Sequence, residues 1–157
     1  MDPALHPQVQ PIAFLLGVWR GQGKGEYPTI EPFRFGEEMR FEHVGEPYLV
    51  YAQRSSLLDD GSPLHLERGF VRVRGDQIEL TLAHPLGLTE IAEGPLDGTA
   101  FDVRTGTVGR TTTGSAVTGV RRRYRAEGDW LTYELDMEML AVPMTQHLEA
   151  ELRRDRS

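Results

Sequence analysis

Residues 17–28 read GVWRGQGKGEYP, and this glycine-rich stretch separates two classes of fold. In a phosphate-binding loop the glycines precede a helix, so that backbone amides and the positive end of the helix face the anion. Here the glycines lead into Pro28, which holds the preceding residue in an extended conformation. Lys24 is also followed by Gly25, not by the serine or threonine that holds magnesium in such loops. The stretch therefore predicts a strand.

As a strand, the stretch has one nearly bare face. Alternation places Gly17, Trp19, Gly21, Gly23 and Gly25 on one side, and Val18, Arg20, Gln22, Lys24 and Glu26 on the other. The second side is predicted to face water. A face of bare backbone either permits sharp bending or leaves room for a ligand to lie against the strand, and alternation alone leaves both interpretations open.

The rest of the chain repeats this pattern of short strands between turns. Turn signals such as Asp59-Asp60-Gly61, Gly75-Asp76 and Asp97-Gly98 separate runs rich in β-branched and aromatic residues, which is typical of consecutive antiparallel strands. About ten strands are predicted, at residues 17–26, 33–44, 48–57, 65–74, 77–83, 88–95, 99–105, 117–126, 130–140 and 144–153. Only Pro7–Leu16 indicates a short turn of helix.

Ten strands joined by short turns must hide their edges, and closure into an up-and-down antiparallel β-barrel is the usual solution. Because strands do not alternate with long helices, the sequence disfavours a doubly wound nucleotide-binding fold. We expect one domain over residues 1–157. The segment RTGTVGRTTTGSA, Arg104 to Ala116, is small and polar and is predicted to be a mobile surface loop.

Composition excludes several functions. The absence of cysteine removes disulfides, thiolate metal sites and thiol nucleophiles. A net charge of -7, from 17 Lys and Arg against 24 Asp and Glu, repels the phosphates of nucleic acid. The longest early apolar stretch, Ile12 to Trp19, is too short to span a membrane, and no basic signal-peptide region precedes it. We expect a cytoplasmic protein with neither nucleic-acid nor membrane partners.

The five histidines lack the i, i+4 spacing of a helical zinc motif, but a single imidazole can hold a haem iron. His6, His43 and His84 are most simply surface residues. His65 opens a strand with the same parity as Glu67, which leaves its position ambiguous. His147 shares its parity with Glu149 and Glu151, so that alternation alone places it on the polar face.

Charged clusters in the sequence are predicted to be solvated. Glu37-Glu38 and Asp59-Asp60 are adjacent pairs, and neighbours on a strand point to opposite faces, so that neither pair can act together. The RRRYR run, Arg121 to Arg125, is predicted to be an alternating strand in an acidic protein and not a nucleic-acid patch.

Several motifs together resemble the nitrobindin family of haem-binding β-barrels. The GxWxGxG pattern is met by residues 17–23, and it is joined by YPTIEPFRF, PYLVYAQRS, HLERGFVRV and the closing PMTQHLEAELRR. The resemblance extends from about Ile12 to Arg154. It implies a ten-stranded barrel of the fatty-acid-binding type with one b-type haem, an enzyme that isomerises peroxynitrite to nitrate, and a ferric iron that also binds nitric oxide.

The resemblance also implies roles for three residues. His147 is the iron ligand, Thr29 a haem contact, and His65 a weaker distal-side candidate. The glycine face would then carry a flat cofactor. Ligation by His147 requires that its face turn inward or that a β-bulge shift the register by one residue. A non-catalytic carrier or sensor of haem, nitric oxide or fatty acid is the alternative function, and a homodimer is suggested by the resemblance alone.

Overall fold

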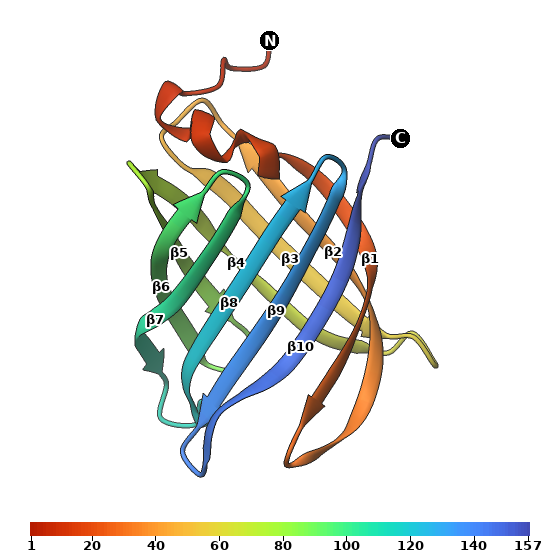
Figure 1. The fold of residues 1–157 in the computed structure, drawn as a ribbon. Coiled ribbons are helices and arrows are strands. Elements are labelled where there is room, and N and C mark those ends of the chain that lie inside the picture. The colour runs from red at the N-terminus through yellow and green to blue at the C-terminus, as the bar shows by residue number, and fades with distance from the viewer.

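The computed structural model describes all 157 residues and forms a closed barrel of ten antiparallel strands preceded by a short 3-10 helix (Figure 1). The elements are η1 (Pro7–Leu15), β1 (Gly17–Tyr27), β2 (Ile30–His43), β3 (Leu49–Leu57), β4 (Pro63–Arg74), β5 (Gln77–His84), β6 (Leu88–Asp97), β7 (Ala100–Arg110), β8 (Val117–Glu127), β9 (Trp130–Met139) and β10 (Val142–Asp155). Each strand pairs with the next, and β1 pairs with β10. The predicted up-and-down barrel is confirmed.

The short hairpin turns lie where the sequence signals them. Gly98, between β6 and β7, has φ +60°, and Gly128, between β8 and β9, has φ +59°. Both values are in the left-handed region, which glycine adopts without the steric cost of a Cβ atom. These turns fix the register of the strands that follow.

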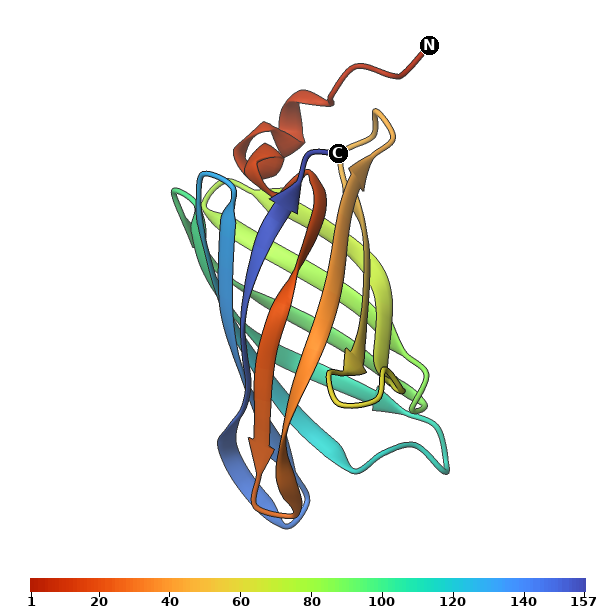
Figure 2. The same cartoon turned by 90° about the vertical axis from the view of Figure 1, so that its right-hand side faces the viewer.

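One end of the barrel is closed by η1, which lies across it beside both termini (Figures 1 and 2). Val9, Ile12 and Leu15 of this helix are fully buried. The indole Nε1 of Trp19 donates a hydrogen bond to the Leu15 carbonyl at 2.8 Å, and the Arg154 guanidinium lies 4.2 Å from the centre of the indole ring. Trp19 therefore anchors this plug. No helix of the structure has the length and apolar composition needed to cross a membrane.

The glycine face of β1 is packed, not open. A Cβ atom at Gly21 would overlap the backbone carbonyl of Glu151 in β10, and one at Gly25 would overlap the ring of Phe33. At Gly23 the ring of Phe35 and the β10 backbone fill the same space. Close approach of the neighbouring backbone and phenyl rings is what the structure shows at these three glycines, and this was neither of the two interpretations that alternation left open. The expectation of a flat cofactor against these glycines is wrong, because β10 and two phenyl rings occupy the position.

Alanine at Gly21 should therefore separate β1 from β10. We expect Gly21→Ala to lower the free energy of unfolding by about 1–3 kcal/mol, the usual cost of overpacking. Gly36→Ala in β2 is the control, because its Cβ would make only ordinary contacts, with Leu58 at 3.6 Å and the Gly21 carbonyl oxygen at 4.0 Å, and we expect a change within about 0.5 kcal/mol. Urea unfolding measures both variants. Equal effects would contradict the close approach of β10 as the reason for this glycine.

The prediction of a mobile loop from Arg104 to Ala116 is wrong over residues 104–110. These residues belong to β7, and residues 107–110 pair with residues 88–91 of β6. The pairing of β7 with β8 ends at Arg104 and Arg121, and the end of β7 turns away from β8 (Figure 1). One neighbouring strand, β6, is sufficient to hold the backbone of residues 107–110. Small polar side chains are therefore compatible with this part of β7.

Candidate functional site

The barrel encloses a cavity of about 480 Å³, within the usual range of small-molecule and cofactor sites. Most of its lining is apolar, with Phe33, Phe35, Met137, Met139 and Leu148 as examples. It reaches the end of the barrel opposite η1, where the β1–β2 and β9–β10 hairpins lie (Figure 2). A second hollow of about 870 Å³ is lined mainly by polar and charged residues and by no histidine, so that the apolar cavity is the better ligand site.

His147 reaches this cavity through a β-bulge. Gln146 pairs with Asp136 of β9, and Leu148 pairs with the next residue, Leu135, so that His147 is the extra residue of β10. Both His147 and Leu148 then line the cavity. Alternation alone placed His147 on the polar face of its strand. This prediction is wrong, because the bulge shifts the register by one residue and the side chain is half-buried.

The protonation of His147 follows from its neighbours. Its Nδ1 lies 3.0 Å from the carbonyl oxygen of Glu26, which can only accept, and so Nδ1 carries the proton and Nε2 keeps a lone pair. Burial lowers the pKa of His147, which favours the neutral ring. The rings of Tyr27 and Phe33 approach the imidazole edge-on, with centroids 5.3 and 6.3 Å away. A neutral, oriented imidazole with one free nitrogen is the form that ligates a metal.

The glycine stretch contributes to this arrangement indirectly. The Phe33 ring lies against the bare backbone of Gly25 and also contacts His147. Thr29 lies exposed in the turn between β1 and β2 and does not line the cavity, although the next residue, Ile30, does. Its contact with a cofactor stays a prediction. His65 lines the same cavity from β4.

A buried ionic network forms the polar wall of the cavity. Arg122 donates to both oxygens of Glu67 at 2.8 Å, and to those of Glu90 at 2.8 and 2.9 Å. The three residues are 2–4 % exposed. Burial alone would raise the pKa of both carboxyls, but the guanidinium outweighs it and lowers the pKa of each. Both glutamates are therefore ionised, and Arg122 holds them together. The expected alternation of the RRRYR run is confirmed, with Arg122 and Tyr124 facing inward.

Two histidines extend this network. The Nε2 of His84 lies 3.1 Å from Oε1 of Glu90, and its Nδ1 lies 3.2 Å from Nε2 of His65. The expectation of a surface position for His84 is wrong, because only 9 % of its side chain is exposed. Strand β5 continues to His84, which shares the inward face of Leu80 and Leu82. Extending that alternation by one step would have identified it.

Glu37 is also inside the barrel, so the expectation that it is solvated is wrong. It lies on the inward face of β2 between Phe35 and Met39, and it is 7 % exposed. Its Oε2 accepts hydrogen bonds from Gln53 at 2.6 Å and from Tyr133 at 2.9 Å. Burial raises the pKa of Glu37 to about 7, although both hydrogen bonds oppose the shift.

Glu37 should make stability depend on pH near neutrality. Because its folded pKa of about 7 exceeds the ordinary value of 4.5, the folded state binds its proton more tightly, and stability falls as pH rises through this window. We expect Glu37→Gln to be more stable than the wild type by up to about 3 kcal/mol at pH 8.5, with little difference at pH 4.5. Urea unfolding at the two pH values measures this.

Glu38→Gln is the matched control for Glu37→Gln. Glu38 lies on the outer face, where its hydrogen bonds to Arg40 and Arg20 outweigh burial and lower its pKa. Ionised Glu38 therefore contributes stability at pH values above its unfolded pKa, and this contribution is lost as the pH falls below that value. Glu38→Gln should therefore bring no gain at pH 8.5. A gain in both variants, or in neither, would contradict the assignment of the shift to burial of Glu37.

A closed barrel around an apolar cavity, with one neutral imidazole presented by a bulge at its lining, defines a β-barrel that binds a small ligand or a haem-type cofactor. The chain belongs to the family described as the THAP4-like, heme-binding beta-barrel domain, whose sequence model matches residues 8–154. This family confirms the resemblance to haem-binding barrels.

Similar proteins cover the whole chain. "Peroxynitrite isomerase 2" of Mycobacterium marinum (strain ATCC BAA-535 / M) is 47% identical over 98% of this chain and 99% of its own length. "Peroxynitrite isomerase" of Nocardia farcinica (strain IFM 10152) is 47% identical over 97% of this chain and 94% of its own. The crystal structure of Rv2717c from M. tuberculosis superposes with a TM-score of 0.91 at 42% identity, covering 98% of this chain and all of that one.

Proposed function

We propose that this chain is a haem-dependent peroxynitrite isomerase, which converts peroxynitrite to nitrate and also binds nitric oxide. Full-length relatives at 44–47% identity carry the first of these names, and the family is described as heme-binding. The observation that carries the proposal to this chain is His147, which lines the apolar cavity at the bulge in β10 and whose Nδ1 donates to the Glu26 carbonyl, leaving Nε2 as a possible ligand atom.

The residues of the cavity fit a haem held on one side. His147 would ligate the iron through Nε2, while the Glu26 carbonyl keeps the proton on Nδ1 and the rings of Tyr27 and Phe33 limit rotation of the imidazole. When bound, a ferric haem supplies the Lewis-acid centre at which peroxynitrite rearranges. The apolar lining excludes water from that reaction, and we assign Thr29 and His65 as further cofactor contacts.

The charge of the interior argues against a fatty-acid carrier. A fatty-acid carboxylate needs an available cation, but the buried Arg122 is already paired with Glu67 and Glu90. With both glutamates ionised, the network has one excess negative charge and would repel a further carboxylate. A carrier or sensor of haem or nitric oxide is then the alternative that the experiment must distinguish.

Hemin titration followed by stopped-flow kinetics tests the proposal. We expect one hemin per chain with a shifted Soret band, and peroxynitrite decay faster than with the same concentration of free hemin, with nitrate as the product. Hemin binding without faster decay would leave a carrier or sensor. No Soret shift would overturn the haem assignment itself.

We also propose that the protein is cytoplasmic and that it forms a homodimer. The acidic composition and the absence of cysteine support the first statement, and the family resemblance supports the second. Sedimentation of the hemin-loaded protein tests the dimer, and a mass of one chain would overturn it.

A further inference from the structure

We propose that His65, Glu67 and His84 form a binding site for one divalent transition-metal ion, with Zn²⁺ as the ion that the ligand set fits best. The site lies in the wall of the barrel cavity and does not include His147. It does not depend on the proposed haem chemistry, because every contact that supports it is made by protein side chains.

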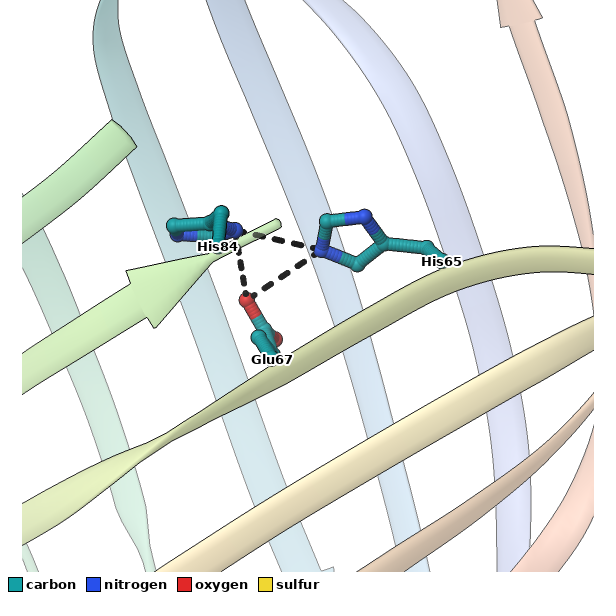
Figure 3. Close-up of side chains that lie close together, drawn as sticks. All are labelled: His65, Glu67 and His84. Carbon is teal, nitrogen blue, oxygen red and sulfur yellow. Dashed lines mark hydrogen bonds and ion pairs between the residues drawn. The ribbon is translucent and has the colours of Figure 1, made fainter. Parts of the chain in front are cut away.

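The three ligand atoms have the spacing of a metal site. His65 Nε2 and His84 Nδ1 are 3.2 Å apart, and Oε2 of Glu67 lies 3.6 Å from the first and 3.5 Å from the second. Figure 3 shows the three atoms converging as a nearly equilateral triangle. Zinc bonds of about 2.0–2.1 Å in a tetrahedron separate neighbouring ligands by about 3.3–3.4 Å. Small side-chain movements would therefore suffice to hold an ion.

The fold places these atoms together through strand register. His65 and Glu67 are two residues apart on β4 and so face the same side of the strand. Arg68 pairs with Ala83 of β5, so that Glu67 and His84 occupy the next position of the same ladder. Two histidines and one glutamate are a known set for zinc, and such three-ligand sites keep a fourth position open. Here that position would face the cavity, which all three residues line.

The hydrogen bonds around the cluster match those of a metal site. His84 Nε2 donates to Glu90, because an ionised carboxylate can only accept, and Nδ1 on the other side of the ring faces His65 Nε2 and Glu67 Oε2. A metal-ligating histidine commonly donates its other N–H to a carboxylate in this manner. Oε2 of Glu67 accepts one guanidinium hydrogen bond, from Arg122, and retains capacity for a ligand bond.

The charge of the surroundings favours a cation. Glu67 and Glu90 are both ionised and buried, and Arg122 supplies the one full positive charge between them. The excess negative charge has little access to water, which makes it costly. A divalent ion beside Glu67 would offset that charge.

Titration of haem-free protein lacking any polyhistidine tag tests the site. We expect calorimetry to show one Zn²⁺ per chain, and Co²⁺ to give the intense visible bands of tetrahedral coordination. His65→Ala should weaken Zn²⁺ binding at least ~10–100-fold, since it removes a ligand from a half-exposed position. His6→Ala, which changes a histidine at the other end of the barrel, should leave the affinity unchanged. Loss of Zn²⁺ binding in His147→Ala would place the ion at the wrong histidine and overturn the proposal.

NMR of the wild-type protein tests the site without relying on a variant that could fail to fold. Zn²⁺ should shift the imidazole NMR signals of His65 and His84 and leave that of His6 in place. Absence of Zn²⁺ binding by the wild type, equal binding by a folded His65→Ala, or shifts confined to other histidines would each overturn the site.

Discussion

Replacing His147 with alanine is expected to lower the affinity for hemin at least ~100-fold and to remove the Soret band of the histidine-ligated iron. Loss of outer hydrogen-bond partners alone costs about 10–100-fold at metal sites, and loss of the ligand itself should cost more. His147 lines the cavity at the β10 bulge, and its Nε2 keeps a lone pair because Nδ1 donates to the Glu26 carbonyl, so Nε2 is the expected iron ligand. Peroxynitrite decay should then fall to the rate of free hemin.

Two controls separate loss of the ligand from loss of the fold. Added imidazole should enter the space left by the His147 side chain and restore a nitrogen-ligated spectrum, which a misfolded barrel could not do. His6→Ala should bind hemin as the wild type does, because His6 only caps η1 by accepting a hydrogen bond from the Gln8 amide at 3.1 Å. If His147→Ala kept an unchanged spectrum and rate, another residue would be the iron ligand, with His65 the next to test.

Alternation and turn chemistry predicted the barrel because both act locally. The inward face of β5, with Ile78, Leu80 and Leu82, is apparent from the sequence since its neighbours on the other face are polar or small. Strands β2 and β10 begin before their predicted ranges, because the β1–β2 and β9–β10 hairpins extend past the barrel body, where side chains need not be apolar (Figure 2). The second half of β7 was missed for a different reason, because its residues are mostly small and polar and residues 107–110 pair with β6 and not with β8.

The polar interior could not be predicted in the same way. Glu67, Glu90 and Arg122 come from β4, β6 and β8, and only closure of the barrel brings them within hydrogen-bond distance. Each shares its parity with buried apolar residues, so that their inward position was detectable, but their pairing depends on strand register and tilt. Ligation by His147 required either that its face turn inward or that a β-bulge shift the register. The structure has the bulge, but no turn or glycine signal in the sequence marks it.

Replacing Arg122 with methionine should have the largest effect on stability. The change leaves Glu67 and Glu90 buried without their counter-charge, and removal of one partner of a buried ionic network costs about 3–5 kcal/mol. We expect a loss of this size in the free energy of unfolding at pH 7. Replacing all three residues, as Glu67→Gln, Glu90→Gln and Arg122→Met together, should recover most of it, because no buried charge then remains.

The pH dependence of Arg122→Met tests the cause. In the wild type the two carboxyls have lowered pKa values, so the stability they contribute is present above the ordinary pKa of 4.5 and is lost as pH falls below it. Without Arg122, burial should raise the pKa of both carboxyls, so that they become protonated at a higher pH in the variant than in the wild type. Protonation removes the buried negative charges, and the difference in unfolding free energy between variant and wild type should therefore narrow from pH 7 to pH 5.

Arg123→Met on the same strand is the control for Arg122→Met, because Arg123 is paired on the outer face with Glu134 and Asp136. Such exposed pairs contribute about 1 kcal/mol or less. Denaturant unfolding of both variants at pH 7 and pH 5 compares them directly. A deficit for Arg122→Met that matched Arg123→Met, or that widened in acid, would mean that the carboxyls do not need the guanidinium to remain buried. The excess negative charge that excludes a fatty acid from the cavity, and that would attract a metal ion to Glu67, would then be absent as well.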